Sequence, residues 1–337
     1  MPQACVVGVD LGGTNVRACA YLQDGTEAGA KFSNPSNAQV SVESVVESIS
    51  KTVKQAVEAS AAPVQAAGIG IPGHIDDESG LVRWAPNFRM RAGSPDIWRD
   101  VPLKAALEKA TGLPFHTGND ANLAALGEYR FGSGKGSAKC LVMITLGTGV
   151  GGGVIMSPSA VHGRATGPLM LVGGDKGGAE LGHVCIDPIE QAYGSGAKGS
   201  LESFIGQHGI IGRAAAKLAA GASSPILDEL RQGAAPDPLM LFKAAEQGDK
   251  VALDVWQETG YFLGLGIGSF VNLFAPDVLA IGGQISKASR FFLPAALESA
   301  KAVAIPTLFG DANIVIAERV EDAGLLGSAA LALEMIS

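Results

Sequence analysis

Hydrophobic positions near the N-terminus alternate between short apolar runs, typical of buried strands, and a longer stretch with helical spacing. The apolar runs at residues 5–9 and 66–71 have strand length and predict two buried strands. Between them, one face of residues 41–60 is apolar at helical spacing, which predicts an amphipathic helix. That face consists of Val42, Val45, Val46, Ile49, Val53 and Val57.

The rest of the chain continues this alternation, which indicates an α/β fold. A further strand is predicted after the Asp24-Gly25 turn, and residues 74–87 are expected to form a loop. Two strand–turn–strand starts, near residues 10 and 145, imply two α/β domains with a boundary near residues 114–118. Strands are predicted at residues 113–117, 140–144, 278–281 and 314–317, and helices at 101–110, 121–129, 201–218 and 322–335.

Two glycine-rich turns follow apolar runs and are the strongest chemical signal in the chain. The first is Asp10-Leu-Gly-Gly-Thr-Asn15, and the second is Thr145-Leu-Gly-Thr-Gly149. Glycines permit positive φ and let a ligand approach the main chain, and successive bare N–H groups form an anion-binding concavity. Two ordinary glycine hairpins are the alternative. The pairing of Thr-Gly motifs, with an acid at Asp10, favours two phosphate-holding turns.

Several polar residues stand where a ligand could be bound. Asp120 lies at a predicted strand-to-helix junction, and ligands of open α/β sheets bind at the carboxyl ends of strands. Asp is also a favoured helix N-cap, so a structural role is an equal alternative. Asn87, beside a proline, is either a positioned hydrogen-bonding group or a turn former. Glu180 and His183, flanked by glycines, could reach one small polar ligand.

Composition narrows the functional classes. The 337 residues suit two domains of ordinary size, and 47% hydrophobic residues supply a sizeable core. Lys and Arg number 25 against 33 Asp and Glu, and the net charge of −8 argues against a nucleic-acid or anionic-membrane surface. No basic region precedes an apolar stretch, so we expect no secretory signal. The four cysteines lack C-x-x-C spacing, which favours a reducing, cytoplasmic setting.

The longest uncharged apolar stretch is residues 261–276. It is shorter than the roughly 20 residues that a membrane helix needs. Gly264 and Gly268 interrupt it at a spacing that would let a helix pack closely on a neighbour. A buried core helix, and no membrane partner, is therefore predicted.

Seven short motifs occur in order along the chain: Asp10-Leu-Gly-Gly-Thr-Asn15, Gly70-Ile-Pro-Gly73, Pro86-Asn87, Gly118-Asn-Asp-Ala-Asn122, Leu146-Gly-Thr-Gly149, Glu180-Leu-Gly-His183 and Gly282-Gly283. Together they resemble the ROK family of bacterial sugar kinases and repressors, its glucokinases most closely. The resemblance implies the actin-like (ribonuclease-H-like) ATPase fold, with two α/β domains around a cleft. It implies a small domain at residues 1–116, on which a C-terminal helix at about 318–337 packs back, and a large domain at 117–317.

The same resemblance implies an ATP-dependent glucokinase that phosphorylates the 6-hydroxyl of glucose to give glucose 6-phosphate. Asp120 would be the general base, and Asp10 would act on Mg²⁺ through water. The sugar would be bound by Asn87, Asn119, Glu180, His183 and Glu202. The nucleotide would be bound by Gly12, Gly13, Thr14, Asn15, Thr145, Gly147, Thr148, Gly149, Gly282 and Gly283.

Alternatives exist within and beyond this activity. The acceptor could instead be fructose, mannose, allose or an N-acetylhexosamine, and the donor could be polyphosphate. A sugar-sensing ROK repressor is disfavoured because the phosphate turn begins at Asp10, leaving no room before it for a helix-turn-helix, and because the chain is acidic. The resemblance implies a cytoplasmic homodimer without a nucleic-acid partner.

Many relatives hold a structural zinc ion with a histidine, at the position of His183, and three cysteines in the motif C-x-C-G-x-x-G-C-x-E. The corresponding run here, Tyr193-Gly-Ser-Gly-Ala-Lys-Gly-Ser-Leu-Glu202, lacks all three cysteines but keeps both glycines and the glutamate. Cys185 alone cannot rebuild a four-ligand site. We therefore predict that elemental analysis of the purified protein finds no stoichiometric zinc, and one zinc ion per chain would contradict this.

Overall fold

The computed structural model describes residues 5–161, 167–173, 178–189, 197–226, 229, 234 and 237–336. The chain forms two compact units. Unit 1 comprises Met1–Leu141, Gly153–Ala179 and Glu318–Ser337, and unit 2 comprises Val142–Gly152 and Glu180–Ala317. Both units combine strands with helices, so the predicted α/β class is confirmed.

Unit 1 is built on a five-stranded sheet in the order β3-β2-β1-β4-β8. β1 and β2 form the antiparallel hairpin that the glycine pattern predicts, and β1, β4 and β8 run parallel. The carboxyl ends of these three parallel strands therefore share one edge of the sheet. The strands are β1 (Cys5–Leu11), β2 (Asn15–Leu22), β3 (Phe32–Pro35), β4 (Val64–Ile71) and β8 (Phe115–Asn119).

The predicted amphipathic helix forms as α1 and buries its apolar face in the core of this sheet. Val45, Ile49 and Val53 are fully buried there. The hydroxyl of Ser41 caps the helix by accepting from the N–H of Ser44. The helices of unit 1 are α1 (Val42–Glu58), α2 (Leu103–Thr111), α3 (Asp120–Phe131) and α11 (Ala323–Ile336).

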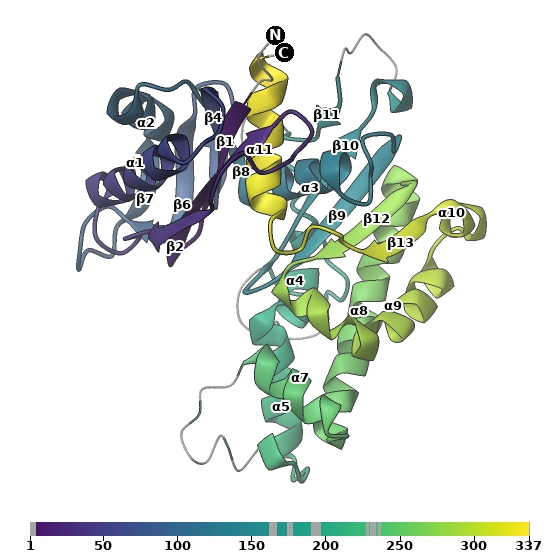
Figure 1. Ribbon diagram of the computed structural model, residues 1–337. Helices are drawn as coiled ribbons and strands as arrows, with labels where there is room; N and C mark the ends of the chain where they lie inside the picture. The colour runs from purple at the N-terminus through teal and green to yellow at the C-terminus, as the bar shows by residue number, and fades with distance from the viewer. Residues whose placement is uncertain are drawn as a thin grey trace. The chain divides into compact units, whose positions relative to one another are not determined.

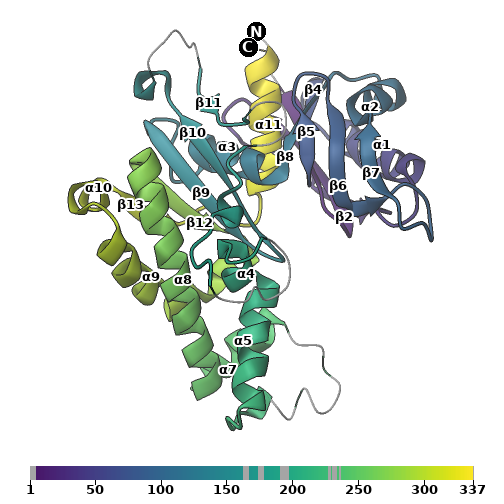
Figure 2. The same cartoon turned by 180° about the vertical axis from the view of Figure 1, so that it is seen from behind.

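A smaller three-stranded sheet, in the order β5-β6-β7, replaces the loop predicted for residues 74–87, which was wrong (Figure 2). Its strands are β5 (His74–Asp76), β6 (Leu81–Arg89) and β7 (Ile97–Val101). The register shifts between Ala85 and Arg89, around Pro86, so the alternation of apolar residues is broken. The buried side chains of Val82 and Phe88 nevertheless anchor β6 in the core.

Helix α11 lies against β1, β4 and α3 of unit 1 (Figure 1). Glycines make this approach possible, because a Cβ at Gly68 would overlap the carbonyl oxygen of Ser328, and a Cβ at Gly327 would overlap that of Leu123. The hydroxyl of Ser328 also donates to the carbonyl oxygen of Val9 at 2.7 Å. The end of the chain is therefore packed backbone against backbone on the first sheet.

A buried carboxylate holds the segment that leads into α11. Glu128, fully buried on α3, accepts hydrogen bonds from the N–H and hydroxyl of Ser133 at 2.9 and 2.7 Å. It also accepts from the N–H groups of Glu318 and Arg319 at 2.8 and 3.0 Å. Four donors compensate the cost of burying one carboxylate. Hydrogen bonds therefore join the end of α3 to residues far away in the sequence.

Unit 1 extends beyond the boundary at 116/117 that the resemblance implies. β8 pairs with β4, and α3 packs against α11, so the chain stays in this unit as far as Leu141.

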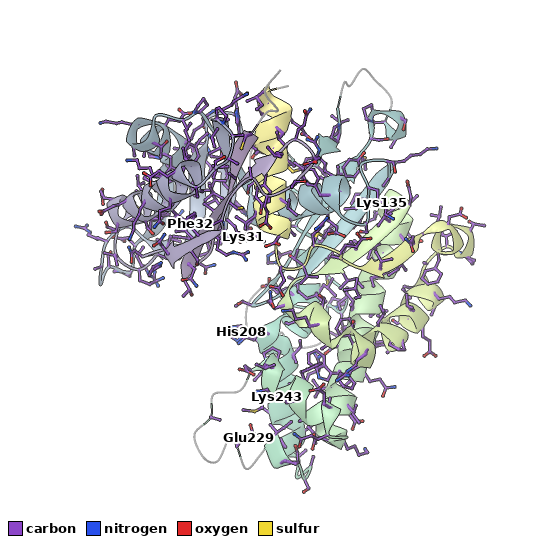
Figure 3. The ribbon with its side chains drawn as sticks, in the orientation of Figure 1. Lys31, Phe32, Lys135, His208, Glu229 and Lys243 are labelled. Carbon is purple, nitrogen blue, oxygen red and sulfur yellow. The ribbon has the colours of Figure 1, made fainter. Side chains whose placement is uncertain are left out.

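Lys31, labelled in Figure 3, adds an ion pair of 2.8 Å to Asp322 just before α11.

A second five-stranded sheet has the order β11-β10-β9-β12-β13, and β9 and β10 contribute residues to both units. Its strands are β9 (Cys140–Leu146), β10 (Val150–Met156), β11 (Leu169–Met170), β12 (Val278–Gly282) and β13 (Asn313–Ile316). The helices of unit 2 are α4 (Leu201–Ile205), α5 (Gln207–Ala219), α7 (Pro238–Glu246), α8 (Lys250–Phe274), α9 (Ser289–Val303) and α10 (Pro306–Asp311).

The predicted buried helix forms as the second half of α8. It packs on α9 through its glycines, because a Cβ at Gly264 would overlap the carbonyl oxygen of Ala296. Leu263, Ile267 and Phe270 are fully buried. Among the helices that the structure describes, none has both the length and the hydropathy to cross a bilayer.

The contact at Gly327 predicts a selective loss of stability. We expect Gly327→Ala to destabilise unit 1 by about 1–3 kcal/mol, because its methyl group cannot fit against the backbone of Leu123. Gly167→Ala is the matched control, since no described atom lies within 4 Å of a Cβ there. Thermal unfolding followed by circular dichroism measures both; equal melting temperatures for the two variants would contradict the close contact.

Candidate functional site

The carboxyl ends of β1, β4 and β8 bring together residues that are far apart in the sequence. Asp10 on β1 is in register with Gly70 on β4, which is in register with Gly118 on β8. Asp120 follows at the start of α3, where its Cα lies 3.3 Å from the position of a Cβ on Gly70. Since adjacent strands are about 4.8 Å apart, the backbones of Asp10 and Asp120 lie within about 10 Å of each other at this edge.

Asp10 is paired with Arg17, a residue that the motifs did not single out. Arg17 Nη2 and Nε donate to Asp10 Oδ2 at 2.5 and 3.2 Å, and Arg17 Nη1 donates to the carbonyl oxygen of Glu321 at 3.0 Å. Burial lowers the pKa of Arg17, but the hydrogen bond and charge of Asp10 outweigh this and raise it, so the guanidinium stays charged. The hairpin register, in which Asp10 faces Arg17, is the signal that could have revealed this pair.

The turn after β1 keeps its main chain open on one side. The N–H of Gly12 donates to the carbonyl oxygen of Asn15 at 2.8 Å and closes the turn, and the carbonyl oxygen of Thr14 accepts from Ser36 at 2.8 Å. No described heavy atom lies within 4 Å of a Cβ built on Gly13. Because Gly12 and Gly13 do not adopt left-handed φ values, positive φ does not explain these glycines. No described neighbour excludes a side chain at Gly13 either.

Asn119, rather than Asp120, is the N-cap of α3. Its Oδ1 accepts from the N–H groups of Ala121 and Asn122 at 2.9 and 3.1 Å, while its Nδ2 donates to the carbonyl oxygen of Gly73 at 3.1 Å. Asp120 is the first residue of the helix, and its Oδ1 accepts from Ala121 at 2.9 Å. The positive end of the helix dipole favours a carboxylate at this position.

Asn87 lies on strand β6, and its side chain is exposed. Its carbonyl oxygen accepts from Gln39 Nε2 at 2.9 Å. Of the two roles weighed from the sequence, the turn former is therefore wrong, because the residue is part of a strand.

In unit 2, a break in a helix supplies the hydrogen bonds that hold the turn from Thr145 to Gly149. The single helix predicted for residues 201–218 is divided into α4 and α5 by the extended backbone of Gly206. The break lets the N–H of Gln207 donate to the carbonyl oxygens of Gly147 and Thr148 at 3.1 and 3.2 Å. No described heavy atom lies within 4 Å of a Cβ on Gly147, so this turn also presents open backbone.

Glu202 is bound to the same turn. Its Oε2 accepts from the N–H of Val150 at 2.9 Å, and a Cβ on Gly149 would overlap that oxygen. The sequence predicted a sugar ligand at Glu202 but gave no sign of this contact. Glu202 therefore couples the start of α4 to the glycine turn.

Glu180 and His183 lie beside this turn, at the ends of a 3-10 helical turn formed by Leu181–His183. That turn packs on β10, since a Cβ on Gly182 would overlap the carbonyl oxygen of Val150. His183 Nε2 is 4.0 Å from Glu180 Oε2, and both side chains are 45% exposed. Within unit 2 the structure thus brings together Glu180, His183, Glu202 and the turn at Gly147–Gly149.

Gly283 has a clear packing role, because it adopts a φ of 80° and a Cβ there would overlap the carbonyl oxygen of Leu146. Gly282 and Gly283 therefore lie against the end of β9. Next to them, a pocket of about 640 Å³ opens from the glycine turn. Such a volume is typical of small-molecule sites. The pocket lining includes Gly147, Thr148, Gln207, Phe242, Trp256 and Gln284.

The run that would carry the zinc cysteines lies partly outside the described residues, which omit 190–196. Its described end is held by main-chain hydrogen bonds. The carbonyl oxygen of Gly199 accepts from Ile186 and Asp187 at 2.8 and 3.2 Å, and Leu201 donates to Val184 at 2.8 Å. Gly199 adopts a φ of 72°, and a Cβ there would overlap the carbonyl oxygen of Asp187. Backbone pairing thus joins the His183 segment to α4.

Comparison with known proteins identifies similar chains over the full length. The chain matches the model of the ROK family over residues 6–335. It is 34% identical over 336 residues to a glucokinase of Thermotoga maritima, covering 100% of this chain and 99% of the relative. A ROK family glucokinase from Streptomyces griseus, solved in complex with glucose and AMPPNP, shares 30% identity and a TM-score of 0.78, with 97% of this chain and 99% of that chain covered.

The likeness to the solved structure confirms the predicted actin-like (ribonuclease-H-like) ATPase fold. Regulators are also among the similar proteins. The DNA-binding transcriptional repressor Mlc of Escherichia coli is 30% identical over 241 residues, which cover 71% of this chain and 53% of that protein. The chain is thus similar both to enzymes and to regulators.

The capping contacts of Asn119 predict its effect on stability. We expect Asn119→Ala to cost about 1–2 kcal/mol, because the N–H of Asn122 loses its acceptor and the N–H of Ala121 keeps only Asp120 Oδ1. Asn119→Ser keeps a capping oxygen and should recover most of this loss. Chemical denaturation of the three proteins measures the difference, and a stability of the alanine variant equal to that of the serine variant would rule out the cap.

Proposed function

The chain belongs to the ROK family, and on this premise we propose that it is a sugar kinase that transfers the γ-phosphate of ATP to the 6-hydroxyl of glucose. Full-length similarity to proteins named glucokinase supports the activity. The observation that carries the proposal is the pair of residues at the start of α3. Asn119 is the N-cap, and Asp120, the first residue of the helix, carries its carboxylate at the positive end of the helix dipole.

Asp120 is proposed as the general base. An alcohol is a weak nucleophile, so a carboxylate within hydrogen-bond reach would take the proton of the sugar hydroxyl as the new O–P bond forms. Its place at a strand end and a helix start supports this role, because ligands of open α/β sheets bind at the carboxyl ends of strands. Phosphoryl transfer otherwise needs mainly positioning and charge stabilisation.

The two glycine turns are proposed to bind the phosphates of the nucleotide. Open backbone at Gly13 and at Gly147 supports this role, since N–H groups can approach phosphate oxygens there without a side chain between them. The threonine hydroxyls of Thr14, Thr145 and Thr148 would add donors. Asn15, Gly12 and Gly149 complete the turns, and Gly282 and Gly283 are proposed to lie near the adenosine.

The sugar hydroxyls are proposed to be read by Asn87, Asn119, Glu180, His183 and Glu202. Several fixed donors and acceptors discriminate between hexoses, because a buried polar group left without its partner is costly. Glu202 would act on the sugar while it also fixes the phosphate turn through Val150. Glucose is the proposed acceptor, and fructose, mannose, allose and N-acetylhexosamines are the alternatives.

Mg²⁺ is proposed to accompany ATP. The described residues contain no group of three or more His, Cys, Asp or Glu side chains suited to hold a metal. Mg²⁺ is usually bound through phosphates and water with one or two carboxylates, and Asp10 is proposed to reach the ion through water. When bound, the ion would neutralise phosphate charge. Arg17, paired with Asp10, would fix the direction of that carboxylate.

A donor and acceptor panel tests the proposed activity. The purified protein should phosphorylate glucose with ATP and Mg²⁺ in a coupled assay, faster than the alternative hexoses and faster than with polyphosphate. Preference for another hexose or for polyphosphate would correct the substrate. Absence of transfer to every sugar, together with a sugar-dependent gel shift of operator-like DNA, would favour the repressor.

Asp120→Ala should lower kcat by at least about 100-fold, because the hydroxyl loses its base. Glucose binding, measured by isothermal titration calorimetry, should stay detectable, because the sugar keeps its other partners. Asp100→Asn is the matched control: it removes an exposed carboxylate of unit 1 at a φ of 49°, which asparagine tolerates, and should leave kcat unchanged. Near-normal turnover by Asp120→Ala would end the assignment.

A further inference from the structure

One wall of the pocket that opens from the Gly147–Gly149 turn is the aromatic ring of Phe242, which is contacted by a residue of α9. Phe242 of α7 lines the pocket together with Pro238 and Leu239. On the other sides lie Trp256 of α8 and the segment after β12. If the turn binds phosphates, as proposed above, this apolar space is where the base of a nucleotide would be accommodated.

α7 is short and depends on tertiary contacts for its orientation. It has nine residues, fewer than an isolated helix needs to be stable in water. Leu241 and Ala245, which are 1% and 4% exposed, attach one side of it to the core of unit 2. Phe242 and Glu246, one turn apart, lie on another side. Lys243, labelled in Figure 3, marks this helix.

Arg290 of α9 contacts both Phe242 and Glu246. Its guanidinium lies 5.2 Å from the centroid of the Phe242 ring and 4.6 Å from that of Phe291. Its Nη2 is ion-paired with Glu246. The rings of Phe242 and Phe291 meet edge to face at 5.8 Å. A planar guanidinium between two rings and one carboxylate fixes both the tilt of the aromatic wall and the position of α7.

From this geometry we infer that Arg290 is a positioning residue for the nucleotide base: it holds Phe242 of α7 as a wall of the pocket beside the Gly147–Gly149 turn. The inference rests on the proposed function, because it assumes a nucleotide donor. Arg290 itself is not among the residues that line the pocket, so it acts through Phe242. Loss of the Arg290 side chain should weaken binding of the nucleotide base. Sugar binding and the rate of the chemical step should stay unchanged.

The test separates nucleotide affinity from turnover. Arg290→Gln should raise the KM for ATP and the Kd for ADP by about threefold to tenfold, because the cation–π contacts and the ion pair are lost. The kcat and the KM for glucose should stay within twofold of the unmutated chain. Arg290→Lys keeps the charge and should recover part of the affinity. ADP binding is measured by isothermal titration calorimetry, independently of activity.

Lys250→Ala is the matched control. It removes an exposed ion pair of the same unit, with Asp254 at 3.4 Å, that lies outside the pocket, and it should change none of these constants. An ADP affinity of Arg290→Gln equal to that of the unmutated chain would overturn the inference. A fall in kcat together with a rise in both KM values would also overturn it, because a general structural defect produces that result. Failure of the unmutated chain to bind ADP would overturn the nucleotide donor itself, and the inference with it.

Discussion

The backbone contact between α11 and the first sheet is the constraint on which the arrangement of unit 1 depends. Gly8, Gly68 and Gly327 leave no side chain at the crossing points, so the helix reaches β1, β4 and α3 directly. Asp10 and Gly70 lie near the carboxyl ends of β1 and β4, Asp120 is the first residue of α3, and Gly324 of the same helix lies against the carboxylate of Asp10. The four hydrogen bonds of Glu128 direct the chain into this helix. A helix more than 300 positions away therefore supports Gly8, Val9 and Asp10 of β1.

Unit 2 achieves the same rigidity by different means. Its glycine turn is held by Gln207, which donates to two carbonyl oxygens, and by Glu202, which accepts from Val150. Gln207 makes its contacts directly after the helix break at Gly206, and Glu202 makes its contact from α4, the helix that ends at this break. The turn thus has open backbone at Gly147, while hydrogen bonds from Gln207 and Glu202 hold it in place. A backbone that is already rigid before a ligand arrives loses little entropy on binding.

The sequence could predict the elements with strong periodicity and the residues with recognisable motifs. α1, β1 with β2, and the glycine-packed part of α8 form as expected, because local pattern and tertiary burial agree there. The strand β6 was missed, because Pro86 and the shifted register hide its alternation. The helix break at Gly206 was missed because its cause is a turn more than 50 positions earlier. Arg17 and Glu128 had no motif, since their partners are defined only by the fold.

The roles of neighbouring polar residues in unit 1 also follow from contacts rather than from residue type. Asn119 and Asp120 are both ordinary helix caps by sequence, and Asp10 is an ordinary strand-end acid. In the fold, Asn119 donates to Gly73 and accepts from α3, and Asp10 is bound by Arg17. Asn119 thus supplies the N-cap oxygen of α3 beside Asp120, and Arg17 supplies the countercharge of Asp10. The proposed proton transfer therefore concerns a carboxylate at the positive end of α3, a helix that already has Asn119 as its N-cap.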